Sequence, residues 1–206
     1  MPRLAVEAKE ARREHILRAA LRCFARSGYY PTTVDDIAAE AGVSKGAPYV
    51  YFESKEALFQ QLYDSWDCGL ATRIDAALAR LRSQGSRSPR TTLEAIIVAV
   101  GAHVTEETDL CRVLIEARTQ AAYVDAIAKR FRSSQADAEG KMKQLIEAGV
   151  ARGEWPPETN PELHAQLILA TLHGLMAQWH LSPGSFSWDE MARALAAGVG
   201  ETGGSG

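Results

Sequence analysis

Small and polar side chains suited to contacting a polyanion gather in one short segment of the chain. Lys45 supplies a cation and Tyr49 an aromatic hydroxyl group, while Gly46 and Ala47 between them allow a close approach to the backbone. Cations and hydroxyl groups donate hydrogen bonds to phosphate oxygens and to the base edges of a DNA groove. The segment therefore predicts contact with DNA, provided that its neighbours hold it on the surface.

The residues before this segment predict a short helix that ends in a sharp turn. Thr33 stands three residues before Asp36, the spacing of a capping box in which each side chain bonds the other residue's backbone N–H. A helix should therefore begin at Val34. Gly42 readily adopts the positive φ that ends a helix, so we expect the turn there.

A second and a third helix are predicted directly after the turn. Ser44 is a suitable N-cap for a helix over residues 45–51, and Ser54 caps the next one. Pro48 removes a backbone donor, so the second helix should be short and 3₁₀-like at its start. Lys55 stands in the first turn of the third helix, where its charge opposes the helix dipole. A nearby phosphate would account for this cation.

Between Thr32 and Leu58 the chain reads TTVDDIAAEAGVSKGAPYVYFESKEAL. With its flanks, from Arg12 to Leu62, this segment closely resembles the DNA-binding domain of TetR-family transcriptional regulators. The resemblance covers the first third of the chain and implies a helix-turn-helix that enters the DNA major groove. It also implies the DNA-facing residues, to which we add the cap Ser44: Thr33, Lys45, Gly46, Tyr49, Tyr51 and Lys55.

The composition is that of a globular chain without a membrane span. The 206 residues are 46% hydrophobic and 24% charged, enough to bury a core in one or two domains. No apolar run reaches the roughly 18 residues of a membrane helix, and the N-terminus is charged where a signal peptide is apolar. We therefore expect a cytoplasmic protein with no membrane partner. Its three widely spaced cysteines should be reduced thiols.

A net charge of −3 conceals a basic N-terminal part. Residues 1–30 hold seven cations against three acids, a local balance of +4. This distribution favours attraction of phosphate to the N-terminal arm and the first helix. A solvated outer face of a helix over residues 7–27 explains the same pattern, but the neighbouring motif favours the first interpretation.

Apolar residues recur at helical spacing through the rest of the chain, without the alternation typical of β-strands. One helix of about 28 residues is predicted from Ser54 to Arg82, long enough to leave the DNA-binding unit and enter a second one. We therefore predict an all-α fold in which residues 1–53 form an N-terminal three-helix helix-turn-helix domain. The long helix joins it to a C-terminal helical bundle, residues 54–200, that dimerises and binds a ligand. Residues 201–206 are predicted to be a flexible tail.

The helix predicted from Pro161 to Leu181 is apolar on nearly every side. Such a helix must be buried on two faces, so one stripe can face its own core and another, with the final helix, a second subunit. We expect a symmetric homodimer, which the family resemblance also implies; the central helix of a monomeric bundle is the alternative. The predicted interface residues are Leu167, Ala170, Gly174, Ala177, Trp188, Met191 and Leu195.

Signatures of catalysis and of metal binding are absent from the sequence. It contains no P-loop, no dinucleotide-binding glycine fingerprint and no nucleophile elbow. His173 and His180 lie seven residues apart, whereas metal ligands on a helix usually stand three or four apart, and His164 does not complete a set. We therefore predict no enzyme, no metal site and no cofactor.

A small-molecule site is expected in the C-terminal bundle, mainly because effectors of the resembling family bind there. Ligand sites are commonly apolar pockets with few polar groups, and the candidate residues are Trp66, Leu70, His103, Arg118, Tyr123 and Met176. The chain is thus expected to be a dimeric repressor, released from a palindromic double-stranded DNA operator by a small apolar or amphipathic effector. The alternative is a helical binding protein whose helix-turn-helix serves protein contacts.

Overall fold

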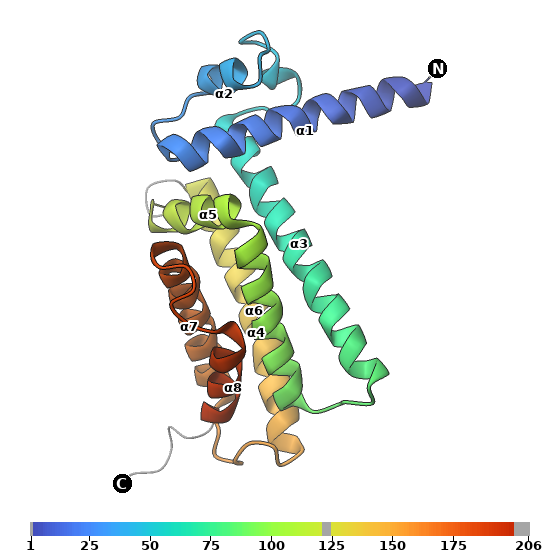
Figure 1. Cartoon of the computed structure of the whole chain (residues 1–206), viewed down its shortest axis with the longest axis vertical. Coiled ribbons are helices and arrows are strands. Elements are labelled where there is room, and N and C mark those ends of the chain that lie inside the picture. Colours follow the sequence, from blue (N-terminus) through green and yellow to red (C-terminus); the bar gives the residue numbers. More distant parts are fainter. Residues whose placement is uncertain (1, 121–124, 200–206) are drawn as a thin grey trace. The chain divides into compact units, whose positions relative to one another are not determined.

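A computed structural model describes residues 2–120 and 125–199, and every regular element in these ranges is helical (Figure 1). In chain order the elements are α1 (Pro2–Ser27), α2 (Val34–Glu40), the 3₁₀ helix η1 (Pro48–Val50), α3 (Lys55–Ser83), α4 (Pro89–Glu106), α5 (Thr108–Gln120), α6 (Asp125–Ala151), α7 (Pro161–Leu181) and α8 (Trp188–Gly198). The all-α prediction is confirmed. Tyr123, a predicted ligand contact, and the predicted tail 201–206 lie outside the described residues.

The helices pack into two compact units. Unit 1 comprises Met1–Asp67 and Thr108–Phe131, and unit 2 comprises Cys68–Glu107 and Arg132–Gly206. The predicted long helix is confirmed as α3, which begins in unit 1 and continues into unit 2. The predicted boundary between residues 53 and 54 does not coincide with this division, because the first turns of α3 belong to the core of unit 1. As a division of function it stays a prediction.

In unit 1, α1 packs against α2 and α5. Ile16, Ala20 and Phe24 are fully buried at a spacing of four residues, which forms one stripe along α1. The ring of Tyr29, in the loop after α1, lies with its centroid 5.3 Å from that of Phe24 and 5.3 Å from that of Phe59 on α3. These aromatic contacts fix the beginning of α3 against α1.

In unit 2, α4 packs against α7 and α8. Gly101 on α4 permits a close approach of α8, since a Cβ there would lie 2.3 Å from Cγ of Trp188 on α8. Trp155 covers Gly149 on α6, and its indole N–H donates to the carbonyl oxygen of Ala196 at 3.0 Å. Two tryptophans therefore hold α8 in the core of unit 2.

Candidate DNA-binding surface

Both ends of α2 have the predicted local structure. Thr33 Oγ1 accepts from the N–H of Asp36 at 3.1 Å, and Asp36 Oδ2 accepts from the N–H of Thr33 at 2.8 Å. Hydrogen bonds from the hydroxyl and N–H of Thr33 hold the pKa of Asp36 below its ordinary value. Beyond the other end, Gly42 has a φ of 63°, which gives the predicted turn. Capping box and turn are thus both confirmed.

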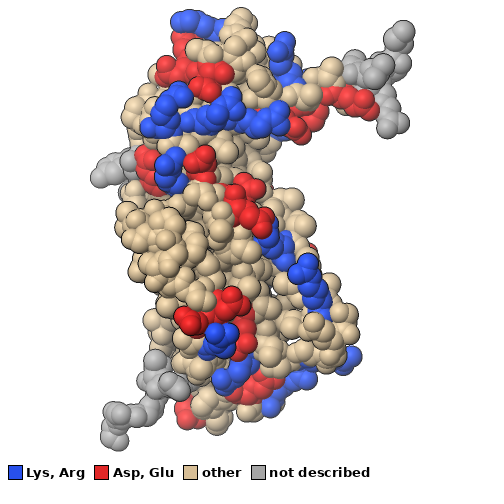
Figure 2. Space-filling model, viewed as in Figure 1, with Lys and Arg blue, Asp and Glu red and all other residues tan. Residues whose placement is uncertain are grey.

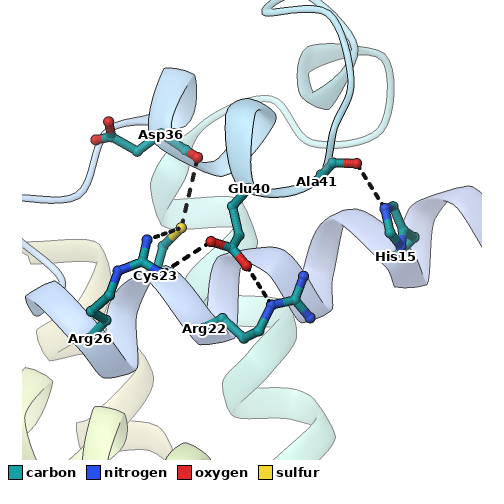
Figure 3. Close-up of polar contacts among 7 residues, drawn as sticks. All are labelled: His15, Arg22, Cys23, Arg26, Asp36, Glu40 and Ala41. Atoms are coloured by element: carbon teal, nitrogen blue, oxygen red, sulfur yellow. Dashed lines mark hydrogen bonds and ion pairs between the residues drawn. The ribbon is translucent and has the colours of Figure 1, made fainter.

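Glu40, the last residue of α2, ties this helix to α1 (Figure 3). Arg22 Nε donates to Glu40 Oε1 at 2.7 Å, and Arg26 Nη1 donates to Glu40 Oε2 at 3.1 Å. Figure 3 shows the carboxylate of Glu40 between the two guanidinium groups. The hydrogen bonds from Arg22 and Arg26 hold the pKa of Glu40 below its ordinary value, so the carboxylate is charged at neutral pH and accepts two charge-assisted bonds.

His15 and Cys23 extend the contact between α1 and α2 (Figure 3). Nε2 of His15 lies 2.9 Å from the carbonyl oxygen of Ala41, and this nitrogen must carry a proton because a carbonyl only accepts. Sγ of Cys23 donates to the carbonyl oxygen of Asp36 at 3.8 Å, and burial raises the pKa of the thiol. α2 is therefore attached to α1 along its length, which orients the turn that follows.

The segment predicted as the second helix is a turn followed by a 3₁₀ helix. The N–H of Ala47 donates to the carbonyl oxygen of Ser44 at 2.9 Å, and η1 follows over Pro48–Val50. The prediction of one helix over residues 45–51 is therefore wrong in its extent, because the regular 3₁₀ helix covers only Pro48–Val50. The bond between Ser44 and Ala47 spans three residues, as in a 3₁₀ turn, which agrees with the predicted 3₁₀-like start. Pro48 is the physical reason, because it has no N–H to donate and its ring crowds the carbonyl of Ser44.

The turn and η1 present side chains to solvent. Tyr49 is 56% exposed, and a Cβ built on Gly46 would meet nothing within 4 Å. Packing within the chain therefore does not explain a glycine at position 46. Of the predicted DNA-facing residues, Tyr51 and Lys55 are half-buried and the others are exposed, namely Thr33, Ser44, Lys45, Gly46 and Tyr49.

Lys45 lies beside an acid of α2. Its Nζ is 2.7 Å from Oδ2 of Asp35, and the two side chains are 80% and 52% exposed. The hydrogen bond to Asp35 raises the pKa of Lys45. Ion pairs this exposed contribute little to stability because water competes for both groups. The pair therefore holds Lys45 beside the turn without preventing its charge from meeting a phosphate.

Lys55 is more enclosed than its predicted role suggests. Its ammonium donates to three carbonyl oxygens of the loop after α1, those of Tyr29 at 3.0 Å, Tyr30 at 3.2 Å and Thr32 at 3.0 Å. The nitrogen also lies 4.5 Å from the ring centroid of Tyr29, and desolvation lowers the pKa of Lys55. An ammonium has three donors, and the loop engages all of them. These carbonyls explain the cation at the helix start without a phosphate, and phosphate contact stays a prediction.

The predicted dimer contacts differ in their exposure. Leu167 is 45% exposed, and a Cβ on Gly174 would meet nothing within 4 Å. Trp188, the first residue of α8, is buried in unit 2 against Gly101, and its part in a dimer interface stays a prediction. Of the remaining predicted interface residues, Ala170 is exposed and three are half-buried, namely Ala177, Met191 and Leu195.

The predicted ligand contacts fall in both compact units. Leu70, His103 and Met176 belong to unit 2, where His103 is 4% exposed. A Cβ on Gly69 of α3 would lie 2.9 Å from Cε1 of His103, so α3 and α4 meet closely beside Leu70. In unit 1 the candidates are Trp66, which is buried, and Arg118, whose guanidinium lies 5.9 Å from the ring centroid of Phe131.

Among residues 2–120 and 125–199, no group of three or more His, Cys, Asp or Glu residues is arranged to hold a metal ion, and all three cysteines are free. None of the described helices is both long and apolar enough to cross a membrane.

The bonds between α1 and α2 were not identified from the sequence, which showed only a charged helix face. A signal was nevertheless present. Arg22 has Arg18 four residues before it and Arg26 four residues after it, so no acid of α1 is placed to pair with it at that spacing. Such a cation must be solvated or paired with another helix, and the next helix along the chain holds three acids, Asp35, Asp36 and Glu40.

Comparison with known proteins identifies the family. Residues 16–62 match the model of bacterial regulatory proteins of the tetR family, and residues 89–203 match the C-terminal model of BetI-type transcriptional repressors. The chain is 30% identical over 188 residues to the HTH-type transcriptional repressor BepR of Brucella suis, with 87% of this chain and 85% of BepR covered. It is 29% identical over 182 residues to the probable HTH-type transcriptional regulator ArpR of Pseudomonas putida, with 87% and 84% covered.

A solved structure has the same fold. FadR of Bacillus subtilis, determined in complex with stearoyl-CoA, is similar with a TM-score of 0.68 at 19% identity, covering 90% of this chain and 96% of FadR. The exposed turn after α2, the bonds that hold α2 on α1 and the two family models lead to one conclusion. The chain belongs to the TetR family of bacterial transcriptional regulators, and it is a DNA-binding regulator and not an enzyme.

Proposed function

We propose that this regulator is a homodimeric repressor that acts in the bacterial cytoplasm, binds a palindromic operator and is released by a small apolar or amphipathic ligand. The observation that carries the proposal is the surface of the turn after α2. Lys45, Gly46 and Tyr49 are exposed there, and packing within the chain requires none of them. The word repressor is supported by the BetI-type C-terminal match and by the name of BepR.

Lys45 and Tyr49 are the best suited of the exposed residues to read DNA. A lysine donates to guanine edges or phosphates, and a tyrosine hydroxyl donates to phosphates. Thr33 is less available, because its hydroxyl proton is already donated to Asp36 Oδ2 at 2.6 Å. Gly46 contributes by having no side chain, because any side chain at this exposed position would project toward the DNA groove. Base preference should therefore depend on Lys45, and close approach on Gly46.

Dimerisation is proposed through an apolar stripe along α7. Leu163 and Leu167 are each 45% exposed and Leu181 is 85% exposed, although all three are large hydrophobic residues. Gly174 lies on the same stripe with open space before it. Exposed apolar faces with small residues suit the isologous contact of a two-fold dimer, and a dimer presents two recognition segments to two half-sites.

The ligand is proposed to bind in the C-terminal part, where α3 and α4 meet beside His103. His103 is buried on a helix whose other buried residues, among them Ile97, Val100 and Val104, are apolar, and it supplies one polar group in that setting. One polar group within an apolar lining fits a ligand with a polar end and an apolar body. Stearoyl-CoA, named with FadR of Bacillus subtilis, is a suitable first amphipathic probe for this chain.

The proposal is tested by selecting duplexes from a random pool with the full chain and measuring affinity by fluorescence anisotropy from about 50 to 200 mM salt. We expect an enriched palindrome whose half-sites lie about 34 to 36 Å apart, and affinity that falls steeply with salt. Enriched sequences without two-fold symmetry would contradict the dimeric arrangement. The absence of any enriched sequence would contradict sequence-specific binding. A ligand that releases the regulator must lower its affinity for DNA by a certain factor, and DNA must lower the affinity of the regulator for that ligand by the same factor.

A further inference from the structure

The cations of α1 differ in whether the chain itself engages them. Six of them have described side chains, and four form ion pairs within the chain: Arg13 with Glu10, Arg18 with Glu14, and both Arg22 and Arg26 with Glu40. Lys9 and Arg12 are exposed, and neither forms an ion pair or hydrogen bond with any residue that the structure describes. Figure 2 shows the setting, with basic side chains in a row along α1 and acidic ones beside them.

Lys9 and Arg12 share a concave surface with a residue of the helix-turn-helix. A depression in unit 1 is lined by Ala8, Lys9, Ala11, Arg12, His15 and Tyr51. Tyr51 directly follows η1 and belongs to the predicted DNA-facing set. His15, on the same wall, is fixed by its bond to the carbonyl of Ala41, so this part of α1 is attached to the turn after α2. The two cations are therefore held beside the recognition segment.

The acids of this part of α1 lie on a different side of the helix. Glu7, Glu10 and Glu14 follow one another at spacings of three and four residues and so form one line. Ala8, Arg12 and His15 follow the same spacings in another line, with Lys9 at its edge. Lys9 and Arg12 therefore face the depression with no carboxylate of α1 among the residues that line it.

We propose that this depression is a second phosphate-binding surface, in which Lys9, Arg12 and the hydroxyl of Tyr51 hold the DNA backbone next to the bases that the recognition segment contacts. The inference rests on the proposed operator binding and adds named contacts outside the helix-turn-helix. Arg12 offers a planar fork that binds phosphate oxygens in pairs, Lys9 a mobile point charge and Tyr51 a hydroxyl donor. The other lining residues are the small Ala8 and Ala11 and His15, whose ring is held by its bond to Ala41.

The contact carries no sequence information, because a phosphate is the same beside every base. The Lys9→Ala/Arg12→Ala variant should therefore weaken binding to operator and to unrelated DNA by the same factor. The slope of log affinity against log salt should become shallower by about 3.6 for the dimer, the value for four phosphate contacts, two in each subunit. Both side chains are exposed and form no described bond, so thermal unfolding should be unchanged.

Arg80→Ala/Arg82→Ala is the matched control, since it removes the same net charge from the end of α3 in unit 2. Its salt slope should equal that of the parent. An equal slope for the Lys9/Arg12 variant and this control, with the parent binding its palindrome, would overturn the inference and leave the proposed function intact. If the parent itself binds no DNA, the proposed function fails first. Tyr51→Phe should weaken binding several-fold in the parent and less in the Lys9/Arg12 variant, because the three groups hold one backbone segment.

Discussion

Replacing Lys55 with methionine separates two roles for this residue, loop attachment and phosphate contact. Methionine keeps an apolar stem but removes the ammonium, so the carbonyls of Tyr29, Tyr30 and Thr32 lose their donor. The bonds to Tyr29 and Thr32 are part-buried, whereas the bond to Tyr30 is exposed, so water can replace only the last at little cost.

The magnitude follows from these contacts. Hydrogen bonds from a charged group contribute about 1.5 kcal/mol each at the low end of their range, which suits a site near the surface. The cation lying over the Tyr29 ring adds about 0.5 kcal/mol. With partial rehydration of the carbonyls, Lys55→Met should lower the free energy of unfolding by about 2 to 3 kcal/mol. At a urea m-value of about 2 kcal/mol per M, the midpoint should fall by about 1 to 1.5 M.

Urea unfolding followed by far-UV circular dichroism measures this loss, because every regular element of the described residues is helical. Lys129→Met is the control, since Lys129 is an exposed lysine of the same unit. On DNA, an unchanged salt slope of Lys55→Met would show that the residue acts through the loop alone, whereas a slope reduced by about 1.8 would show one phosphate contact in each subunit of the dimer. A stability equal to that of the control would refute the loop role.

Three further predictions concern the dimer, the core and the pH dependence. Gly174→Leu should convert the dimer to monomer in light scattering, whereas the control Gly140→Leu, equally open on α6, should remain dimeric. If both variants are dimers, α7 does not form the interface. Gly101→Val should lower the free energy of unfolding by roughly 1 to 3 kcal/mol, because its Cβ collides with Trp188; an unchanged thermal midpoint would count against that packing. Glu40 has a folded-state pKa below its ordinary 4.5, so its stabilisation is complete above that pH and is lost as the pH falls through the lower value. Glu40→Gln should therefore flatten the acid side of the stability curve, and parallel curves would contradict the bonds to Arg22 and Arg26.

Local chemistry made the helix boundaries of unit 1 predictable. The bond pattern of Thr33 and Asp36 and the positive φ of Gly42 involve residues only a few positions apart, so the sequence contains both partners. The backbone geometry after the turn was harder to predict. Pro48 signalled a disturbed helix, but the position of the 3₁₀ turn depended on how the chain returns to the buried Phe52.

Long-range contacts account for what the sequence left open. Lys55 lies 23 to 26 positions from the carbonyls that it bonds, and nothing in its helix indicates a loop that far away. Trp188 shows the same limit, because its apolar character fits an interface as well as the core, and its packing against Gly101 depends on a residue 87 positions away. Helical periodicity predicts which face is apolar but not what covers it.

The central claim is that the turn after α2 lies directly against DNA, and Gly46→Leu tests it most directly. A Cβ at Gly46 meets nothing within 4 Å and the glycine does not have a positive φ, so the chain should fold with unchanged thermal stability. Gly140→Leu, open in the same way but on α6, is the control. We expect anisotropy titration with the selected palindrome to show no specific binding by Gly46→Leu and parental affinity for Gly140→Leu. Parental affinity for Gly46→Leu would contradict the account.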